Sequence, residues 1–146
     1  MIIRFVKLKN TAVTPAKMHP EDACYDLYAA EDGLVPAKGG TFTAMLGIAI
    51  ELPYGFAGII KGRSGLTKAG VIVPTGTVDA NYRGEIGVTL VNCSNKTFKF
   101  KQGDRIAQFC LTPTYSLYFD EVEELNATDR GSQGFGSTGG IQDPEK

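Results

Sequence analysis

Short runs in which hydrophobic and polar residues alternate recur along most of the chain, with the period of two that is typical of half-buried β-strands. Runs rich in Gly, Pro, Asn and Asp separate them, as in Pro53-Tyr54-Gly55 and Gln102-Gly103-Asp104. Many short strands with turns roughly every 8–12 residues predict an all-β sandwich, jelly roll or barrel. The expected strands are 2–8, 25–29, 41–52, 56–61, 71–73, 86–91, 97–101, 105–111 and 115–122.

Helical periodicity is almost absent from the chain. The one helix that we expect lies at 64–69, where Ser64 can act as the N-cap and Gly70 occupies a position that favours glycine after a helix. After about residue 125 the composition changes to polar residues and glycines without a hydrophobic pattern. We therefore predict a β core domain at 1–125 and a mobile glycine-rich arm at 126–146.

The balance of ionisable residues limits the classes of function. With 15 Lys plus Arg and 16 Asp plus Glu, the chain lacks the basic excess of a duplex-DNA-binding protein, but a few cations suffice for a small anionic ligand. The single histidine, His19, excludes a multi-histidine zinc site, and the proline that follows it indicates a surface loop. Catalysis is therefore expected to depend on carboxylates, arginines and an added metal ion.

The cysteines and the hydrophobic runs bear on the cellular compartment. Cys24, Cys93 and Cys110 are odd in number and lack CxxC spacing, which argues against a disulfide framework and a metal cluster. The N-terminal residues do not resemble a signal peptide, and the longest hydrophobic run, 44–50, is too short to span a membrane. We expect a soluble protein of a reducing compartment, cytoplasmic or nuclear and not secreted.

Two stretches in the middle of the chain carry side chains that plain strands do not need. In the stretch 62–66, Arg63, Ser64 and backbone amides lie at the start of the short helix, which fits an anion site. The alternative is an ordinary capped turn with an exposed arginine. The stretch 76–87 is predicted to be a hairpin. In its turn, Tyr82 and Asp79 would suit a ligand ring beside a general base, and a solvated surface turn is the equal alternative.

Two later stretches have similar character. Gln108, in Gly103-Asp104-Arg105-Ile106-Ala107-Gln108, falls on the same strand face as Ile106 and Cys110, so its amide needs a partner from the protein or from a ligand. In 130–139, glycines would let the backbone approach a polyphosphate, and an aromatic ring could stack on a base. A flexible tail is the alternative for that segment.

Together with Ala23-Cys24-Tyr25-Asp26-Leu27, these stretches resemble the five ordered motifs of the trimeric dUTPase family, over about residues 23–139. Each motif alone is weakly specific, whereas five in order with compatible spacing are very specific. Cys24 departs from the family pattern because glycine is usual there, and we expect an extended backbone at this position.

The resemblance implies a jelly-roll-like β domain that assembles as a homotrimer, with three active sites shared between subunits and a mobile C-terminal arm that closes over them. It implies hydrolysis of dUTP to dUMP and pyrophosphate with Mg²⁺, a reaction that keeps dUTP low and supplies dUMP for thymidylate synthesis. We expect neither duplex nucleic acid nor a membrane as a partner, because of the charge balance and the short hydrophobic runs given above.

The same resemblance implies a role for individual residues. Asp79 would be the general base for the water that attacks the α-phosphorus, and Asp26 would contact hydrated Mg²⁺ through water, unless its role is to stabilise a turn. The residues at the base and sugar would be Gly76, Tyr82, Gly87 and Phe135, with Tyr82 excluding a 2′-hydroxyl. The phosphate-binding residues would be Arg63, Ser64, Gly65, Gln108, Arg130, Gly136, Ser137 and Thr138.

Three other functions remain open at this point. A dCTP deaminase of similar fold would attack the base and leave the triphosphate intact. A trimer that binds nucleotide without catalysis would keep the fold alone. An oligonucleotide-binding barrel would need a basic groove with an aromatic platform, which the net charge of −1 does not favour.

Overall fold

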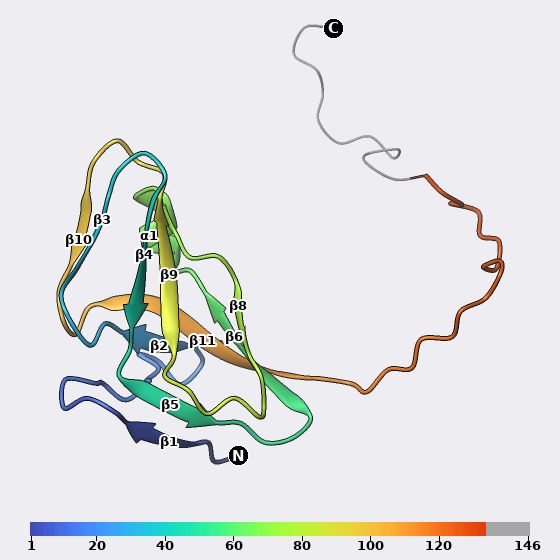
Figure 1. The fold of residues 1–146 in the computed structure, drawn as a ribbon, viewed down its shortest axis with the longest axis horizontal. Helices are drawn as coiled ribbons and strands as arrows, with labels where there is room; N and C mark the ends of the chain where they lie inside the picture. The colour runs from blue at the N-terminus through green and yellow to red at the C-terminus, as the bar shows by residue number, and fades with distance from the viewer. Residues whose placement is uncertain (134–146) are drawn as a thin grey trace, which may run out of the picture. The chain divides into compact units, whose positions relative to one another are not determined.

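The computed structural model describes residues 1–133, and the chain divides into two units, Met1–Tyr115 and Ser116–Lys146. Every strand and helix of the described residues lies in the first unit (Figure 1). No helix within residues 1–133 is long and apolar enough to cross a membrane. In chain order the elements are β1 (Arg4–Lys7), β2 (Tyr25–Tyr28), β3 (Gly33–Val35), β4 (Gly40–Met45), β5 (Ile48–Glu51), β6 (Phe56–Lys61), α1 (Ser64–Lys68), β7 (Val71–Ile72), β8 (Gly76–Val78), β9 (Gly87–Asn92), β10 (Phe98–Phe100) and β11 (Arg105–Pro113).

The strands form four antiparallel sheets. The largest has the order β2-β11-β6-β8, the next has the order β4-β9-β7, and β1-β5 and β10-β3 are two-stranded. Buried side chains from all four sheets belong to one hydrophobic cluster, which includes Leu27, Val35, Ile48 and Leu90. The expectation of an all-β fold with many short strands is therefore confirmed.

The burial pattern of β9 shows how the sequence pattern produces this packing. Val88, Leu90 and Asn92 are buried, while Thr89 between them is exposed, as expected for a strand with one face on the core. The one polar member of this row, Asn92, is fully buried and donates hydrogen bonds to the carbonyls of Val35 and Lys96 at 3.1 and 2.8 Å. Its amide group is satisfied inside the core and connects β9 to the end of β3 and to the loop at Lys96.

Several predicted element boundaries were wrong. The single strand expected at 41–52 is two strands, because Gly47 takes a positive φ of 67° between β4 and β5. No strand forms at 115–122, where Tyr118 is 98% exposed, since β11 ends at Pro113 and proline cannot continue the ladder. The short strand β3 had not been predicted.

The hairpin expected at 76–87 is also wrong. β8 pairs with β6, whereas β9 pairs with β4 and β7, so residues 79–86 cross from one sheet to another. The helix prediction is confirmed in position, but Arg63 and not Ser64 is the N-cap residue, without a side-chain capping bond. Gly70, with φ of 82°, follows the helix as expected.

Candidate active site

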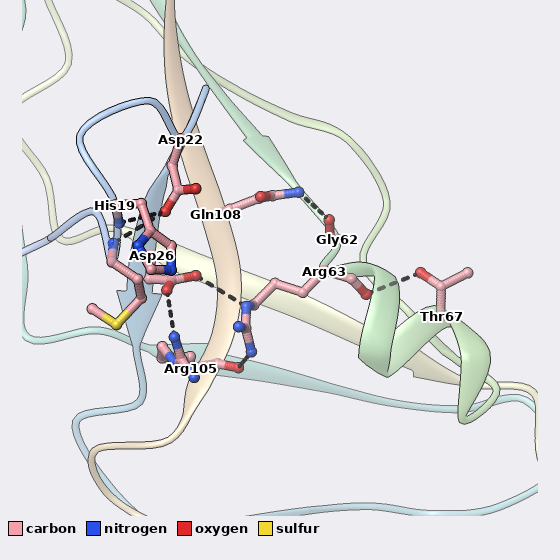
Figure 2. Close-up of polar contacts among 9 residues, drawn as sticks. His19, Asp22, Asp26, Gly62, Arg63, Thr67, Arg105 and Gln108 are labelled. Carbon is pink, nitrogen blue, oxygen red and sulfur yellow. Dashed lines mark hydrogen bonds and ion pairs between the residues drawn. The ribbon is translucent and has the colours of Figure 1, made fainter.

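A carboxylate between two arginines forms the centre of the site (Figure 2). Asp26 Oδ1 lies 3.0 Å from Arg63 Nε, and Asp26 Oδ2 lies 3.1 Å from Arg105 Nη1. Arg63 also donates from Nη1 to the backbone carbonyl of Arg105 at 3.1 Å. The three residues come from β2, the start of α1 and the start of β11, so these contacts fix the ends of three elements relative to one another. Both guanidinium groups are thereby held in defined orientations.

Gln108 connects this centre to the end of β6. Its Nε2 donates a hydrogen bond of 2.7 Å to the carbonyl of Gly62, directly before Arg63 (Figure 2). The partner expected for this polar side chain is therefore a backbone group of the protein. Gln108 remains half-buried and lines a pocket, whereas an irregular register between Arg105 and Ala107 places Ile106 in the core. The expectation that Ile106 shares the face of Gln108 was wrong for this reason.

The pocket beside these residues has a volume of about 480 Å³. Ser64 and Gly65, the first residues of α1, lie exposed at its edge. On the opposite side, Asp22 Oδ2 accepts hydrogen bonds from the backbone N–H groups of Met18 and His19 at 3.2 and 2.9 Å. His19 is exposed in this loop, as predicted. The lining residues are Met18, Asp22, Ala23, Cys24, Asp26, Lys61, Arg63, Ser64, Gly65, Arg105 and Gln108.

The thiol of Cys24 is a neutral part of the pocket wall. Burial raises the pKa of Cys24, and the neighbouring Cys110 raises it further. Cys24 lies in a bend directly before β2 and does not have a positive φ, so it avoids the strained region although it is not part of the extended strand. A raised pKa favours the neutral form of this thiol in the pocket wall.

The pocket is not a preformed metal cage. Both carboxylate oxygens of Asp26 are already paired with arginines, and residues 1–133 contain no group of three His, Cys, Asp or Glu side chains that could hold a metal ion. Mg²⁺ is commonly held by one or two carboxylates together with substrate phosphates and waters. These residues therefore fit an ion that enters with a polyphosphate, and the role of Asp26 toward it, through water, stays a prediction.

The second group of expected site residues lies in the crossover between β8 and β9. Asp79 is exposed, and its carbonyl accepts the backbone N–H of Tyr82 at 3.1 Å, which closes a turn. The Tyr82 hydroxyl donates to the carbonyl of Glu85 at 3.2 Å. Its ring covers Gly84 so closely that a Cβ at Gly84 would lie 2.3 Å from the hydroxyl oxygen. Glu85 in turn accepts the backbone N–H of Gly47 at 2.8 Å, which anchors the crossover to the β4–β5 turn.

Within residues 1–133, the pocket that contains Asp26 does not include the residues of the crossover. Asp79, Tyr82, Gly76 and Gly87 are absent from the lining of the pocket that contains Asp26. Gly76 pairs with Ile60 of β6, and Gly87 pairs with Met45 of β4, so both glycines lie in ladders at the ends of the crossover. The chain therefore carries a cationic pocket and a separate loop with a carboxylate and an aromatic ring.

The expected residues of the arm belong to the second unit. Arg130 is exposed and donates from Nε to the carbonyl of Gln133 at 3.0 Å. Phe135, Gly136, Ser137 and Thr138 lie outside the described residues. Their roles stay predictions.

Sequence reasoning missed three charged residues of the pocket: Asp22, Lys61 and Arg105. Arg105 lies in the stretch 103–108, from which only Gln108 had been predicted as a site residue. Its positive charge was the signal that could have marked it as a candidate site residue. Lys61 had the sequence pattern of a polar residue at the end of a strand. Its position next to Gln108 depends on the strand register, which the sequence does not show.

Comparisons with known proteins show the family of this chain. The dUTPase family model matches residues 10–139. The chain is 41% identical over 141 residues to the deoxyuridine 5′-triphosphate nucleotidohydrolase of Syntrophotalea carbinolica, covering 94% of this chain and 96% of the relative. It is 43% identical over 137 residues to the cowpox virus protein of the same name, covering 94% and 92%.

Solved structures show the same fold. A mutant dUTPase of Staphylococcus bacteriophage 80alpha with dUpNHpp has a TM-score of 0.87, with 24% identity, over 94% of this chain and 98% of that one. A mutant dUTPase of S. aureus phage phi11, which coordinates a structural Mg(II) ion, has a TM-score of 0.80, with 22% identity, over 87% and 100%. With the motifs in order, the fold shared and the family model matching most of its length, this chain belongs to the dUTPase family.

Proposed function

We propose that this protein is a dUTP diphosphatase that hydrolyses dUTP to dUMP and pyrophosphate, which keeps dUTP low and supplies dUMP for thymidylate synthesis. The observation that carries the proposal is the cationic pocket, in which Arg63 and Arg105 are oriented by Asp26 beside Gln108 and Ser64, in a chain of the dUTPase family. A nucleoside triphosphate brings about four negative charges, and fixed cations stabilise such a group.

The reaction needs one proton acceptor. Asp79 accepts a proton from a water molecule as the water oxygen bonds to the α-phosphorus, and the bond to the bridging oxygen breaks to release pyrophosphate. Mg²⁺ bound to the phosphates would neutralise charge on the leaving group. Arg63, Ser64, Gly65 and Gln108 bind and orient the phosphates.

Base and sugar selection belongs to the crossover loop. The backbone at Gly76 and Gly87 reads the uracil edge, and a site of this type can reject a mispaired base by about 10⁴-fold or more. The ring of Tyr82 leaves no room for a 2′-hydroxyl. Its hydrogen bond to Glu85 and its packing on Gly84 support this role, because both hold the ring in one place.

A homotrimer with shared sites would unite the two groups. The separation of Asp79 from the cationic pocket within one chain supports a site in which one subunit supplies the loop and another the phosphate pocket. Light scattering should then give three times the chain mass of 15.6 kDa.

The C-terminal segment completes the proposed site. Residues 126–146 form an arm that closes over the core domain at 1–125, with Arg130, Gly136, Ser137 and Thr138 at the phosphates and Phe135 on the uracil.

Three unpaired cysteines support a reducing compartment, the cytoplasm or the nucleus.

Pyrophosphate release from dUTP, dCTP, dTTP and UTP tests the proposal, with Mg²⁺ and then with excess chelator. We expect release from dUTP alone and its loss with the chelator. Asp79→Asn should lower kcat at least about 100-fold while nucleotide binding persists. Ammonia release from dCTP would instead establish a deaminase, and nucleotide binding without either product would establish a non-catalytic trimer.

A further inference from the structure

Lys61 lies in line with two residues of the pocket. It is the last residue of β6 and pairs with Gln108 of β11, which on its other side pairs with Asp26 of β2. Residues directly opposite each other on neighbouring strands project from the same face of a sheet. Asp26, Gln108 and Lys61 therefore form one row across three strands, and all three line the pocket.

The net positive charge of the pocket depends on Lys61. Three cationic side chains, Lys61, Arg63 and Arg105, line it together with two carboxylates, Asp22 and Asp26, so its net charge is +1 and would be zero without Lys61. Both arginines are paired with Asp26. Among the lining residues, all of which lie within residues 1–133, Lys61 is the one cation that forms no ion pair.

An exposed lysine at the end of a strand is often only solvated, so its neighbours decide its role. Lys61 lies directly opposite the half-buried Gln108 in the ladder between β6 and β11, and both side chains line the pocket. Its ammonium group can therefore reach the interior of the pocket. A lysine without a fixed partner can turn toward an incoming anion with little loss of protein contacts.

We propose that Lys61 is a phosphate-binding residue of this site, donating from Nζ to non-bridging oxygens of the triphosphate. This proposal rests on the proposed function for the identity of the nucleotide, but not for the binding of a polyphosphate. A point charge of this kind binds the substrate and the transition state to a similar extent, so its loss raises KM more than it lowers kcat.

The test compares Lys61→Gln with Lys99→Gln, which removes the same charge from an exposed lysine of β10 outside the pocket. KM and kcat for dUTP are measured with Mg²⁺, and the Kd of inorganic pyrophosphate is measured by calorimetry. We expect Lys61→Gln to raise both KM and Kd about tenfold, the scale of one charge-assisted hydrogen bond, with kcat within about threefold of the wild-type value. Lys61→Arg should recover most of the loss, and Lys99→Gln should match the wild type.

The readouts separate the two hypotheses. If the wild type hydrolyses dUTP and Lys61→Gln matches Lys99→Gln in KM and Kd, the role of Lys61 is refuted while the proposed function stands. A fall in kcat with unchanged KM would also refute it. If the wild type does not hydrolyse dUTP, the proposed function fails, and the Kd of pyrophosphate still decides whether Lys61 binds phosphate.

Discussion

Replacing Asp26 with asparagine keeps the size of the side chain but removes the charge that holds two arginines. Each carboxylate oxygen contacts one guanidinium, at 3.0 Å to Arg63 and 3.1 Å to Arg105. In Asp26→Asn one of these positions becomes an NH₂ group, which cannot accept a hydrogen bond. At least one guanidinium therefore loses its carboxylate partner, and the other faces a neutral oxygen.

The cost follows from the exposure of the three side chains. Removing one partner of a fully buried ion pair costs about 3–5 kcal/mol, whereas an exposed pair contributes about 0–1 kcal/mol. The side chain of Asp26 is 13% exposed, but those of Arg63 and Arg105 are 30% and 38% exposed, so water can partly solvate them. We therefore expect a loss of about 2 kcal/mol in the free energy of unfolding, which for a chain of this length lowers Tm by about 4–8 °C.

Thermal unfolding followed by circular dichroism checks this value, with all variants at the same protein concentration. Asp32→Asn is the matched control, since Asp32 also pairs with a cation, Lys101, but with side chains that are 58% and 76% exposed. The control should have nearly the wild-type Tm. If Asp26→Asn unfolds at the temperature of this control, the two ion pairs do not stabilise the ends of β2, α1 and β11.

Two further predictions concern the crossover loop and the pocket wall. Gly84→Ala should displace the ring of Tyr82, because the new Cβ would lie 2.3 Å from its hydroxyl oxygen. We expect the ratio of kcat/KM for dUTP to kcat/KM for UTP to fall about tenfold. An unchanged ratio would show that Tyr82 does not select the sugar. Because burial raises the pKa of Cys24, its thiolate fraction at pH 8 is small and grows only as the pH rises further. Iodoacetamide should therefore label Cys24 more slowly than the exposed Cys93 at pH 8, as measured by peptide mass spectrometry, and equal rates would contradict this environment.

Local sequence determined the fold class and the kinds of side chain at the site. Alternation with a period of two reports directly on which face of a strand is buried, so most strands, including β9 with Val88 and Leu90, were predictable. Gly70 marked the end of α1 because its left-handed φ is a local requirement. Arg63 and Gln108 could be selected as candidate phosphate-binding residues because their motifs are contiguous in the chain, and both line the pocket, while their roles stay predictions.

The pairing of strands, by contrast, was decided by tertiary structure. The turn residues between Asp79 and Gly84 suit a hairpin and a crossover equally well, and only the ladders to β6 and β4 choose the crossover. Asp26 and Arg105 are 79 positions apart, and their contact depends on the register of β2 against β11. The register of β6 against β11 places Lys61 in the pocket. Nothing local in the chain encodes such a register, because it results from the burial of several strands against a common core.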